Sequence, residues 1–375
     1  MSENEHSGAT TLAHTVGGRP VYRRDLPRPD GRYTYLYGYR PNTADVVPEE
    51  PSEVAKGGEL RFHPLLGEWN VYAPHRQNRT FKPSAADNPL APSIPGLPPT
   101  DIPVTDFELA VFENKFTSLH MEAPDPGAPD HVEAARARGR CDVVVYTPED
   151  HGNLWSVGQD KRRLLLAAWL DRYATLQSEG HAFVMPFESR GEEVGVTLSH
   201  PHGQIYSFPH VPQRQQRAGE AFRAGYDLAA DLDRMRETYD VAEVGGVRAW
   251  CPPYARYPFE TWVVPTRKVA GPWDMSEEEQ DGFMHLLGDV TRRMDAYFGR
   301  DTAYMLSLQA APKVYEADWH FSAQFFPLLR APTPDGKGRV KYLASVEQHT
   351  QVFTVDVMPE FAAEQLRQQT LETGA

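Results

Sequence analysis

The stretch GVTLSHPHGQIYSFPH, from Gly195 to His210, decides how the rest of the chain is interpreted. Apolar and polar residues alternate through it, which predicts a half-buried β-strand. The period of two of a strand places His200, His202 and Gln204 on one face. Two imidazoles and an amide on one pleated face are typical of a chemical site and not of a core.

His202, at the centre of this row, suits nucleophilic attack on phosphorus. A neutral imidazole is a nucleophile near pH 7 when one ring nitrogen is unprotonated and a carbonyl holds the other N–H. Gly203 lets backbone N–H groups approach phosphate oxygens, and Gln204 can donate to a non-bridging oxygen without carrying a charge. The alternatives are a metal-binding pair and a purely structural histidine row. The motif favours phosphoryl or nucleotidyl chemistry over both.

The composition of the 375-residue chain excludes several classes of protein. A net charge of −14 argues against binding to nucleic acid or to an anionic membrane, so local cations must meet a phosphorylated ligand. Cys141 and Cys251 form no CxxC pair, so we expect neither a disulfide framework nor a cysteine-built zinc site. No apolar run is long enough to span a bilayer, and no signal-like segment is present, so we expect a cytoplasmic protein.

A basic loop follows two short predicted strands after Arg61 and carries His75, Arg76 and Arg79. Guanidinium groups match phosphate oxygens bidentately, so closely spaced arginines can clamp a pyrophosphate. The residues alone favour an ordinary solvated loop over such a clamp.

HPHGQIY, from His200 to Tyr206, resembles the active-site strand of galactose-1-phosphate uridylyltransferases, the transferase branch of the histidine-triad superfamily. Further segments resemble that family in the same order along the chain. They are RFHPLLGEWNVYAPHRQNRTFKP from Arg61, VFENKF from Val111, VVVYTPEDHGNLW from Val143, FESRGEEVG from Phe187, YPFETWVVP from Tyr257, FFPLLR from Phe325 and VKYLASVE from Val340. Together they cover nearly everything from about residue 60 to the C-terminus.

The resemblance implies an α+β fold: two tandem histidine-triad-like units of antiparallel sheet flanked by helices, forming one body. The sequence itself repeats a pattern of strands, helix and strands at similar spacing. The first predicted helix runs from about Gly158 to Glu179, and Ser276 and Glu279 form a capping box at the start of the second. A long amphipathic helix is expected between Pro212 and Tyr239.

We expect three parts: an irregular N-terminal arm (1–58), a catalytic half (59–211), and a degenerate second half with a C-terminal sugar-binding segment (212–375). The second half has lost its chemistry, because Ser322 and Gln324 stand where the first half has imidazoles.

The resemblance implies a ping-pong transfer of a uridylyl group between sugar 1-phosphates. His202 attacks the α-phosphorus of a UDP-sugar, and a second sugar 1-phosphate then takes the uridylyl group from it. Gln204 replaces the third histidine of the hydrolases, and an amide cannot act as an acid. The implied catalytic residues are His202, Gln204 and His200; the nucleotide and phosphate residues are Arg76, Arg79, Phe112, Asn114, Ser189, Gly195, Thr197 and Gln204; and the sugar residues, from the opposite subunit of a homodimer, are Lys341 and Glu347.

Many family members bind zinc through a CxxC pair and two histidines. Asn88 and Ala91 occupy the cysteine positions here, while His151 and His200 remain. Two neutral imidazoles without thiolates make a poor structural zinc site. We therefore expect no tightly bound metal cofactor, and we expect His151 and His200 to hold the strand by hydrogen bonds.

Alternative functions stay open at this point. One is a dinucleoside-polyphosphate phosphorylase, which resembles this branch in having glutamine after the histidine pair. Another is a nucleotidyltransferase for an unusual sugar phosphate, because Ser189, Val346 and Phe353 replace polar residues that are usual in the family. The last is a catalytically silent nucleotide-binding protein. The sequence leaves the base and the sugar undecided.

Overall fold

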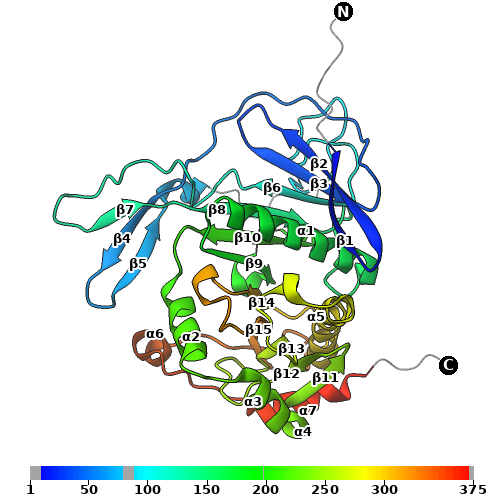
Figure 1. The fold of residues 1–375 in the computed structure, drawn as a ribbon, viewed down its shortest axis with the longest axis vertical. Helices are drawn as coiled ribbons and strands as arrows, with labels where there is room; N and C mark the ends of the chain where they lie inside the picture. Colours follow the sequence, from blue (N-terminus) through cyan, green and yellow to red (C-terminus); the bar gives the residue numbers. More distant parts are fainter. Residues whose placement is uncertain (1–9, 79–87, 197, 371–375) are drawn as a thin grey trace, which may run out of the picture.

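A twelve-stranded antiparallel sheet dominates the computed structural model, which describes residues 10–78, 88–196 and 198–370 (Figure 1). Its strands lie side by side in the order β1-β2-β3-β6-β8-β10-β9-β14-β15-β13-β12-β11. In chain order they are β1 (Thr10–Val16), β2 (Arg19–Pro27), β3 (Tyr33–Gly38), β6 (Leu109–Glu113), β8 (Arg140–Val145), β9 (Phe183–Arg190), β10 (His202–Phe208), β11 (Asp240–Val244), β12 (Val247–Trp250), β13 (Thr261–Pro265), β14 (Tyr304–Gln309) and β15 (Ser322–Pro327).

Two small sheets and seven α-helices complete the described fold. The small sheets consist of β4 (Glu59–His63), β5 (Glu68–Tyr72) and β7 (Ala134–Arg136), and of β16 (Leu329–Ala331) and β17 (Arg339–Val340). The helices are α1 (Gly158–Ser178), α2 (Gln213–Arg223), α3 (Leu228–Arg234), α4 (Arg236–Tyr239), α5 (Glu277–Phe298), α6 (Ser345–Thr350) and α7 (Pro359–Gln368). Short 3-10 helices include η1 (Pro74–Asn78), η3 (Glu192–Val194), η4 (Pro272–Asp274) and η5 (Lys313–Tyr315).

The main sheet contains two units with the same connectivity. In the first unit the strands lie in the order β6-β8-β10-β9, and α1 connects β8 to β9. In the second the order is β12-β13-β15-β14, and α5 connects β13 to β14. Strands β9 and β14 pair directly, so the two units share one continuous sheet. The expected α+β fold with two similar units is confirmed.

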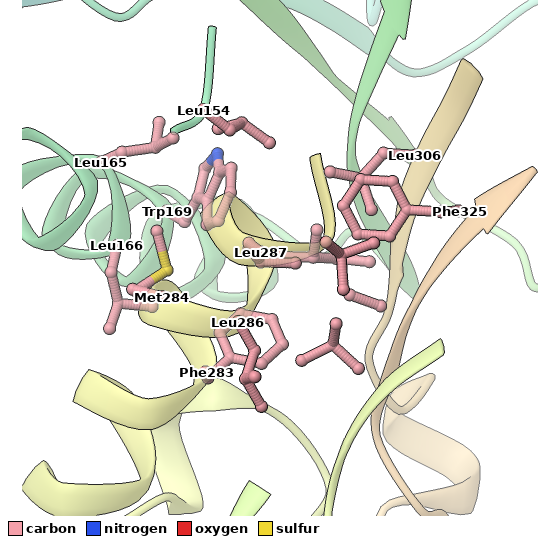
Figure 2. Close-up of a cluster of buried hydrophobic side chains, with 14 of the residues drawn as sticks. Leu154, Leu165, Leu166, Trp169, Phe283, Met284, Leu286, Leu287, Leu306 and Phe325 are labelled. Atoms are coloured by element: carbon pink, nitrogen blue, oxygen red, sulfur yellow. The ribbon is translucent and has the colours of Figure 1, made fainter. Parts of the chain in front are cut away.

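Helices α1 and α5 bury one face of this sheet. Figure 2 shows Trp169 of α1 and Leu287 of α5 meeting Leu306 of β14 and Phe325 of β15 in the core. Ile205 of β10 belongs to the same apolar cluster. Because side chains of a strand alternate between faces, His202 and Gln204 lie on the face of β10 away from the two helices.

The predicted helix boundaries agree closely with the structure. Helix α1 covers Gly158–Ser178, and α5 begins with the predicted capping box of Ser276 and Glu279. Gly299 ends α5 in the left-handed region, at φ 67°, where glycine carries no steric cost.

Three expectations about local structure are wrong. Residues 10–38 form β1, β2 and β3 instead of an irregular arm, and apolar side chains of this arginine-rich segment, including Val21, Leu26 and Leu36, are buried in the sheet. The long helix expected after Pro212 is divided into α2, α3 and α4, with Gly225 in the left-handed region between the first two. The histidine strand begins only at His202, directly after Pro201, which has no N–H to donate to a ladder.

Gly203 is required by a close approach on the helix side of β10. A Cβ atom there would lie 2.4 Å from the hydroxyl of Tyr146 and 2.8 Å from the carbonyl oxygen of Phe187. That hydroxyl donates to Glu188 Oε2 (2.9 Å), and the hydroxyl of Tyr304 donates to Glu188 Oε1 (2.6 Å). Burial raises the pKa of Glu188. The strand that carries His202 therefore rests on a buried network with members from both units.

We expect Gly203→Ala to lower the free energy of unfolding by about 1–3 kcal/mol, the usual cost of overpacking a tight interior. Ser207→Ala is the matched control. Ser207 lies on the same face of β10, and its buried hydroxyl has no hydrogen-bond partner among the described residues. Denaturant unfolding monitored by circular dichroism measures both. Equal stability of the two variants would contradict this account of Gly203.

Candidate active site

His202 is the first residue of β10, and its imidazole is oriented by the backbone. Nδ1 lies 2.7 Å from the carbonyl oxygen of His200, a geometry in which Nδ1–H donates to that oxygen. This tautomer places the basic lone pair on Nε2. When the ring is neutral, this orientation makes Nε2 the nitrogen that can attack phosphorus.

Two adjoining cavities meet at His202. The loop cavity, about 520 Å³, lies beside the segment that follows β9 and includes Arg190 and Arg300 in its lining. The β6 cavity, about 320 Å³, lies at the end of β6 and includes Phe112 and Val143. The residues that line both cavities are Ser189, Val196, Leu198 and His202. An elongated ligand, with a ring at one end and charged groups at the other, can therefore occupy both cavities and pass the His202 imidazole between them.

The β6 cavity collects most of the predicted nucleotide residues. Those in its lining are Arg76, Phe112, Asn114, Ser189, Gly195, His202 and Gln204. Arg79 and Thr197 lie outside the described residues. Sequence reasoning had gathered these positions from segments far apart in the chain, and the sheet brings them together.

The backbone of Phe116 orients two of these side chains. Arg76 Nη1 donates to the Phe116 carbonyl at 2.7 Å, and the Phe116 N–H donates to Asn114 Oδ1 at 2.9 Å. Gly195 follows η3 with φ 77°, a left-handed conformation that favours glycine. Local backbone geometry thus fixes the wall of the cavity.

Gln204 lies two residues beyond His202 on the same face of β10, and its backbone pairs with Val143 and Phe187. The side-chain amide lines the β6 cavity beside the buried ring of Phe112. An aromatic ring beside a side-chain amide suits a planar ring that carries a few polar groups.

Two charged residues in this lining were not predicted from the sequence. Lys115 supplies a cation, and Asp101 supplies a carboxyl whose pKa is raised by burial. Lys115 belongs to the VFENKF segment and could have been found there. Asp101 lies in a proline-rich loop, where no sequence pattern marks it.

The loop cavity contains cations that are already paired with carboxylates. Arg190 bonds Asp295 (2.8 Å) and Asp301 (2.5 Å), and Arg300 bonds Glu193 at 2.9 Å. These pairs also escaped sequence reasoning, because their members lie on different units of the sheet. They give this side of the site a mixed charge.

His200 is a structural residue of the site. Its Nε2 donates to the Thr147 carbonyl (2.8 Å), and its Nδ1 accepts from the side-chain amide of Asn88 (2.8 Å). Burial lowers the pKa of His200, which keeps the ring neutral. The bonds join the entrance of β10 to two other segments, as expected for this residue.

The corresponding expectation for His151 is wrong. Its side chain is 84% exposed, and its Nδ1 lies 3.0 Å from the carboxylate of the adjacent Asp150. A turn held at the surface cannot anchor the strand. Within the residues that the structure describes, no group of three or more His, Cys, Asp or Glu side chains is arranged to hold a metal ion.

Lys341 and Glu347 lie in neither cavity of the same chain. Both are buried, and Lys341 Nζ donates to Glu347 Oε1 (3.1 Å) and to the Thr354 carbonyl (2.6 Å). Backbone hydrogen bonds and the Lys341 ammonium lower the pKa of Glu347. The structure therefore does not bring these two predicted sugar residues to His202 within one chain.

None of the helices in the described ranges has the length and apolar character needed to cross a membrane.

Comparisons with known proteins agree on one family. Residues 49–212 match the family model described as galactose-1-phosphate uridyl transferase, N-terminal domain. A galactose-1-phosphate uridylyltransferase of Thermotoga maritima is 33% identical over 327 residues, which cover 84% of this chain and 99% of that protein. One of Streptomyces lividans is 31% identical, covering 90% and 95%. A solved uridylyltransferase structure has a TM-score of 0.72 and 26% identity, covering 83% of this chain and 97% of that one.

We expect the stability of the protein to fall as the pH drops below about 6.5, the pKa of an exposed histidine. His200 has a lowered pKa in the folded state, so unfolding takes up a proton in this range. Its contribution is complete above that pH and is lost toward its folded pKa. Other buried histidines with lowered pKa values, including His181 and His320, add to the slope.

His200→Gln should therefore make the pH dependence shallower, while His151→Gln at the surface should leave it unchanged. Melting temperatures between pH 5 and 8 measure this. An equally steep loss in His200→Gln and in the unaltered chain would show that His200 is not held neutral.

Proposed function

The chain belongs to the galactose-1-phosphate uridylyltransferase family, and from this we propose that it transfers a uridylyl group between sugar 1-phosphates. The single observation that carries the proposal is the orientation of His202. Its Nδ1–H is held by the His200 carbonyl, so its basic nitrogen is Nε2, and the ring lines two cavities at once.

The proposed reaction is a ping-pong exchange in two balanced steps. Nε2 of His202 attacks the α-phosphorus of a UDP-sugar, an N–P bond forms, and the P–O bond to the departing sugar 1-phosphate breaks. The oxygen of a second sugar 1-phosphate then attacks the same phosphorus, and the electron pair of the N–P bond returns to Nε2. Neither step needs an external proton. The leaving group is a stable sugar 1-phosphate anion in the first step and the neutral His202 imidazole in the second.

The β6 cavity supports a nucleotide in this position. We place the base against Phe112 and Val143, and the ribose near Asn114. The phosphates lie toward Gly195, Arg76 and Lys115. Ser189, at the junction of both cavities, offers one hydroxyl donor where the family usually has an asparagine.

Gln204 keeps water from being activated at the intermediate. Its amide can donate to a non-bridging oxygen of the phosphoramidate, but it cannot supply or accept a proton as a histidine would. The stored uridylyl group therefore survives while the sugar phosphates exchange.

We propose that the sugar half of the site comes from a second copy of the chain. Lys341 and Glu347 line neither cavity of their own chain, yet neighbouring apolar side chains are exposed, with Tyr342 at 78%. Leu65, at the turn between β4 and β5, is 88% exposed. Exposed apolar patches mark protein interfaces, so these segments suit a homodimer.

We propose that the chain binds no structural zinc. Asn88 and Ala91 offer no thiolate, and Asn88 donates to a ring nitrogen of His200 that a metal would need. The other ring nitrogen of His200 is bonded to a carbonyl, and His151 lies at the surface. The described donor set therefore does not fit the metal, and no step of the reaction depends on it.

A second candidate is the same chemistry on an unusual sugar phosphate. Val346 is exposed and offers no hydrogen bond, and the ring of Phe353 packs against Tyr257 with centroids 5.9 Å apart. Loss of polar partners at both positions favours an acceptor with fewer or different hydroxyl groups.

Incubation with UDP-glucose should increase the intact mass of the protein by one uridylyl group per chain, because the N–P intermediate accumulates when no acceptor is present. His202→Asn should abolish the increase, since it removes the nucleophile. His151→Gln, an exposed histidine substitution, should retain it. Mass spectrometry of the intact chain measures all three, and labelling that persists in His202→Asn would rule out the assigned nucleophile.

Gln204→His should raise the hydrolysis of UDP-glucose relative to transfer, because an imidazole at this position can act as an acid and a base. We expect an increase of about 100-fold, the low end of general acid–base contributions. Gln204→Asn is the control, because it retains an amide. Release of free UMP measures hydrolysis, and no rise above Gln204→Asn would contradict the proposed role.

His202→Asn and Glu347→Gln should each be inactive alone but should restore activity when the two chains are co-expressed. A mixed dimer contains one complete site, and random pairing gives about one quarter of the full activity. Lys341→Met serves as a second sugar-side variant. Mixed dimers without activity, in preparations where their formation is verified, would show that Glu347 acts within its own chain.

A further inference from the structure

A third cavity, of about 400 Å³, lies in the second unit of the sheet and is called here the second-unit pocket. The strand registers connect it to the His202 site: Gln204 pairs with Phe187, Phe187 with Ser307, Ser307 with Gln324, and Gln324 with Trp262. Directly opposed residues point to the same face of a sheet. Gln204 lines the β6 cavity, and Gln324 and Trp262 line the second-unit pocket. Three strand spacings put the backbones of Gln204 and Gln324 about 15 Å apart.

Aromatic rings form the walls of the second-unit pocket. Phe222 of α2 contacts Trp319 and Tyr226, with ring centroids 5.3 and 5.8 Å apart. Tyr254 and Trp262 form another wall, with centroids 5.8 Å apart. The hydroxyls of Tyr226 and Tyr254 lie 2.7 Å from each other and join the two walls. Aromatic side chains on several sides of one cavity suit a planar ring ligand.

The polar groups in this pocket leave an acceptor for such a ring. The buried Gln324 donates from Nε2 to the hydroxyl of Ser322 (3.1 Å), while its carbonyl oxygen receives no hydrogen bond from any described residue. Gln309 is already engaged by Gln215 (3.1 Å). The Gln324 oxygen is therefore the group that can bind an N–H of a ligand.

Arg214 lines one end of the pocket, and Arg256 lies close to it but outside the lining. The guanidinium carbons of Arg214 and Arg256 lie 5.6 and 5.3 Å from the centroid of the same Phe326 ring. Neither guanidinium makes an ion pair or a hydrogen bond within the described ranges. The nearby carboxylate of Glu260 accepts from the backbone N–H of Arg256 and from the indole of Trp262, both at 2.8 Å.

The Arg214 side chain is exposed at the mouth of the pocket, and desolvation with the Arg256 cation lowers its pKa to about 10, so the group still carries its charge at neutral pH. An anion bound at Arg214 would offset the repulsion from Arg256. This end of the pocket therefore suits a phosphate group.

We propose that the second-unit pocket binds a nucleotide, with its base between the aromatic side chains and its phosphate at Arg214. The site is separate from His202 and does not depend on the transferase assignment. It performs no transfer, because Ser322 and Gln324 stand on β15 where the first unit has imidazoles, so the pocket has no counterpart of His202. Bound nucleotide would bridge helix α2 and strands β14 and β15 of the second unit.

Equilibrium dialysis of the full chain with AMP and with UMP tests the proposal. Arg214→Gln should weaken the second-unit site by about tenfold or more, the effect of losing one charge-assisted hydrogen bond. Arg217→Gln is the matched control, because this exposed arginine lies on the same helix but not in the pocket lining. It should bind both nucleotides as the unaltered chain does.

Asn114→Ala separates the two sites, because Asn114 lines only the β6 cavity. If the proposal is correct, Asn114→Ala weakens nucleotide binding at the His202 site and Arg214→Gln weakens it at the second-unit pocket. The double variant weakens both. If the His202 site binds no nucleotide, only Arg214→Gln has an effect, and the pocket proposal survives. Binding of AMP and UMP that is identical in Arg214→Gln and Arg217→Gln would overturn it.

Discussion

The hydrogen bond from His202 Nδ1 to the His200 carbonyl is the contact on which the site depends. It selects one tautomer of the His202 ring. The accepting carbonyl belongs to His200, whose own side chain is held by two hydrogen bonds. His200 is bonded to Thr147 on one side and to Asn88 on the other, so the carbonyl cannot turn away. A neutral histidine, His200, thus positions His202 through its main-chain carbonyl.

The two units of the sheet contribute to this arrangement together. Glu188 accepts hydrogen bonds from Tyr146 of the first unit and from Tyr304 of the second, directly beneath the strand that carries His202. Burial raises the pKa of this carboxyl, and a proton on it would add a donor to the network. The second unit has therefore kept a supporting role in the chemistry of the first.

Much of the fold and part of the site could be predicted from the sequence, because short-range patterns determined them. Alternation placed His202 and Gln204 on one face, and Ser276 with Glu279 marked the start of α5. Contacts between distant segments were beyond reach. Asp101 enters the β6 cavity from a loop without a motif, and Arg190 of the first unit pairs with Asp295 of the second. Strands β1 to β3 were also missed, because their sequence is rich in arginine and their buried side chains are covered only in the assembled sheet.

The direct pairing of β9 with β14 has a consequence for the ancestry and engineering of such chains. Separating the units would expose two bare strand edges, each a template for aggregation. The two units share this seam of backbone hydrogen bonds, so we expect neither unit to be exchangeable as an independent module. Recombination that replaces one unit must therefore preserve the pairing of β9 with β14.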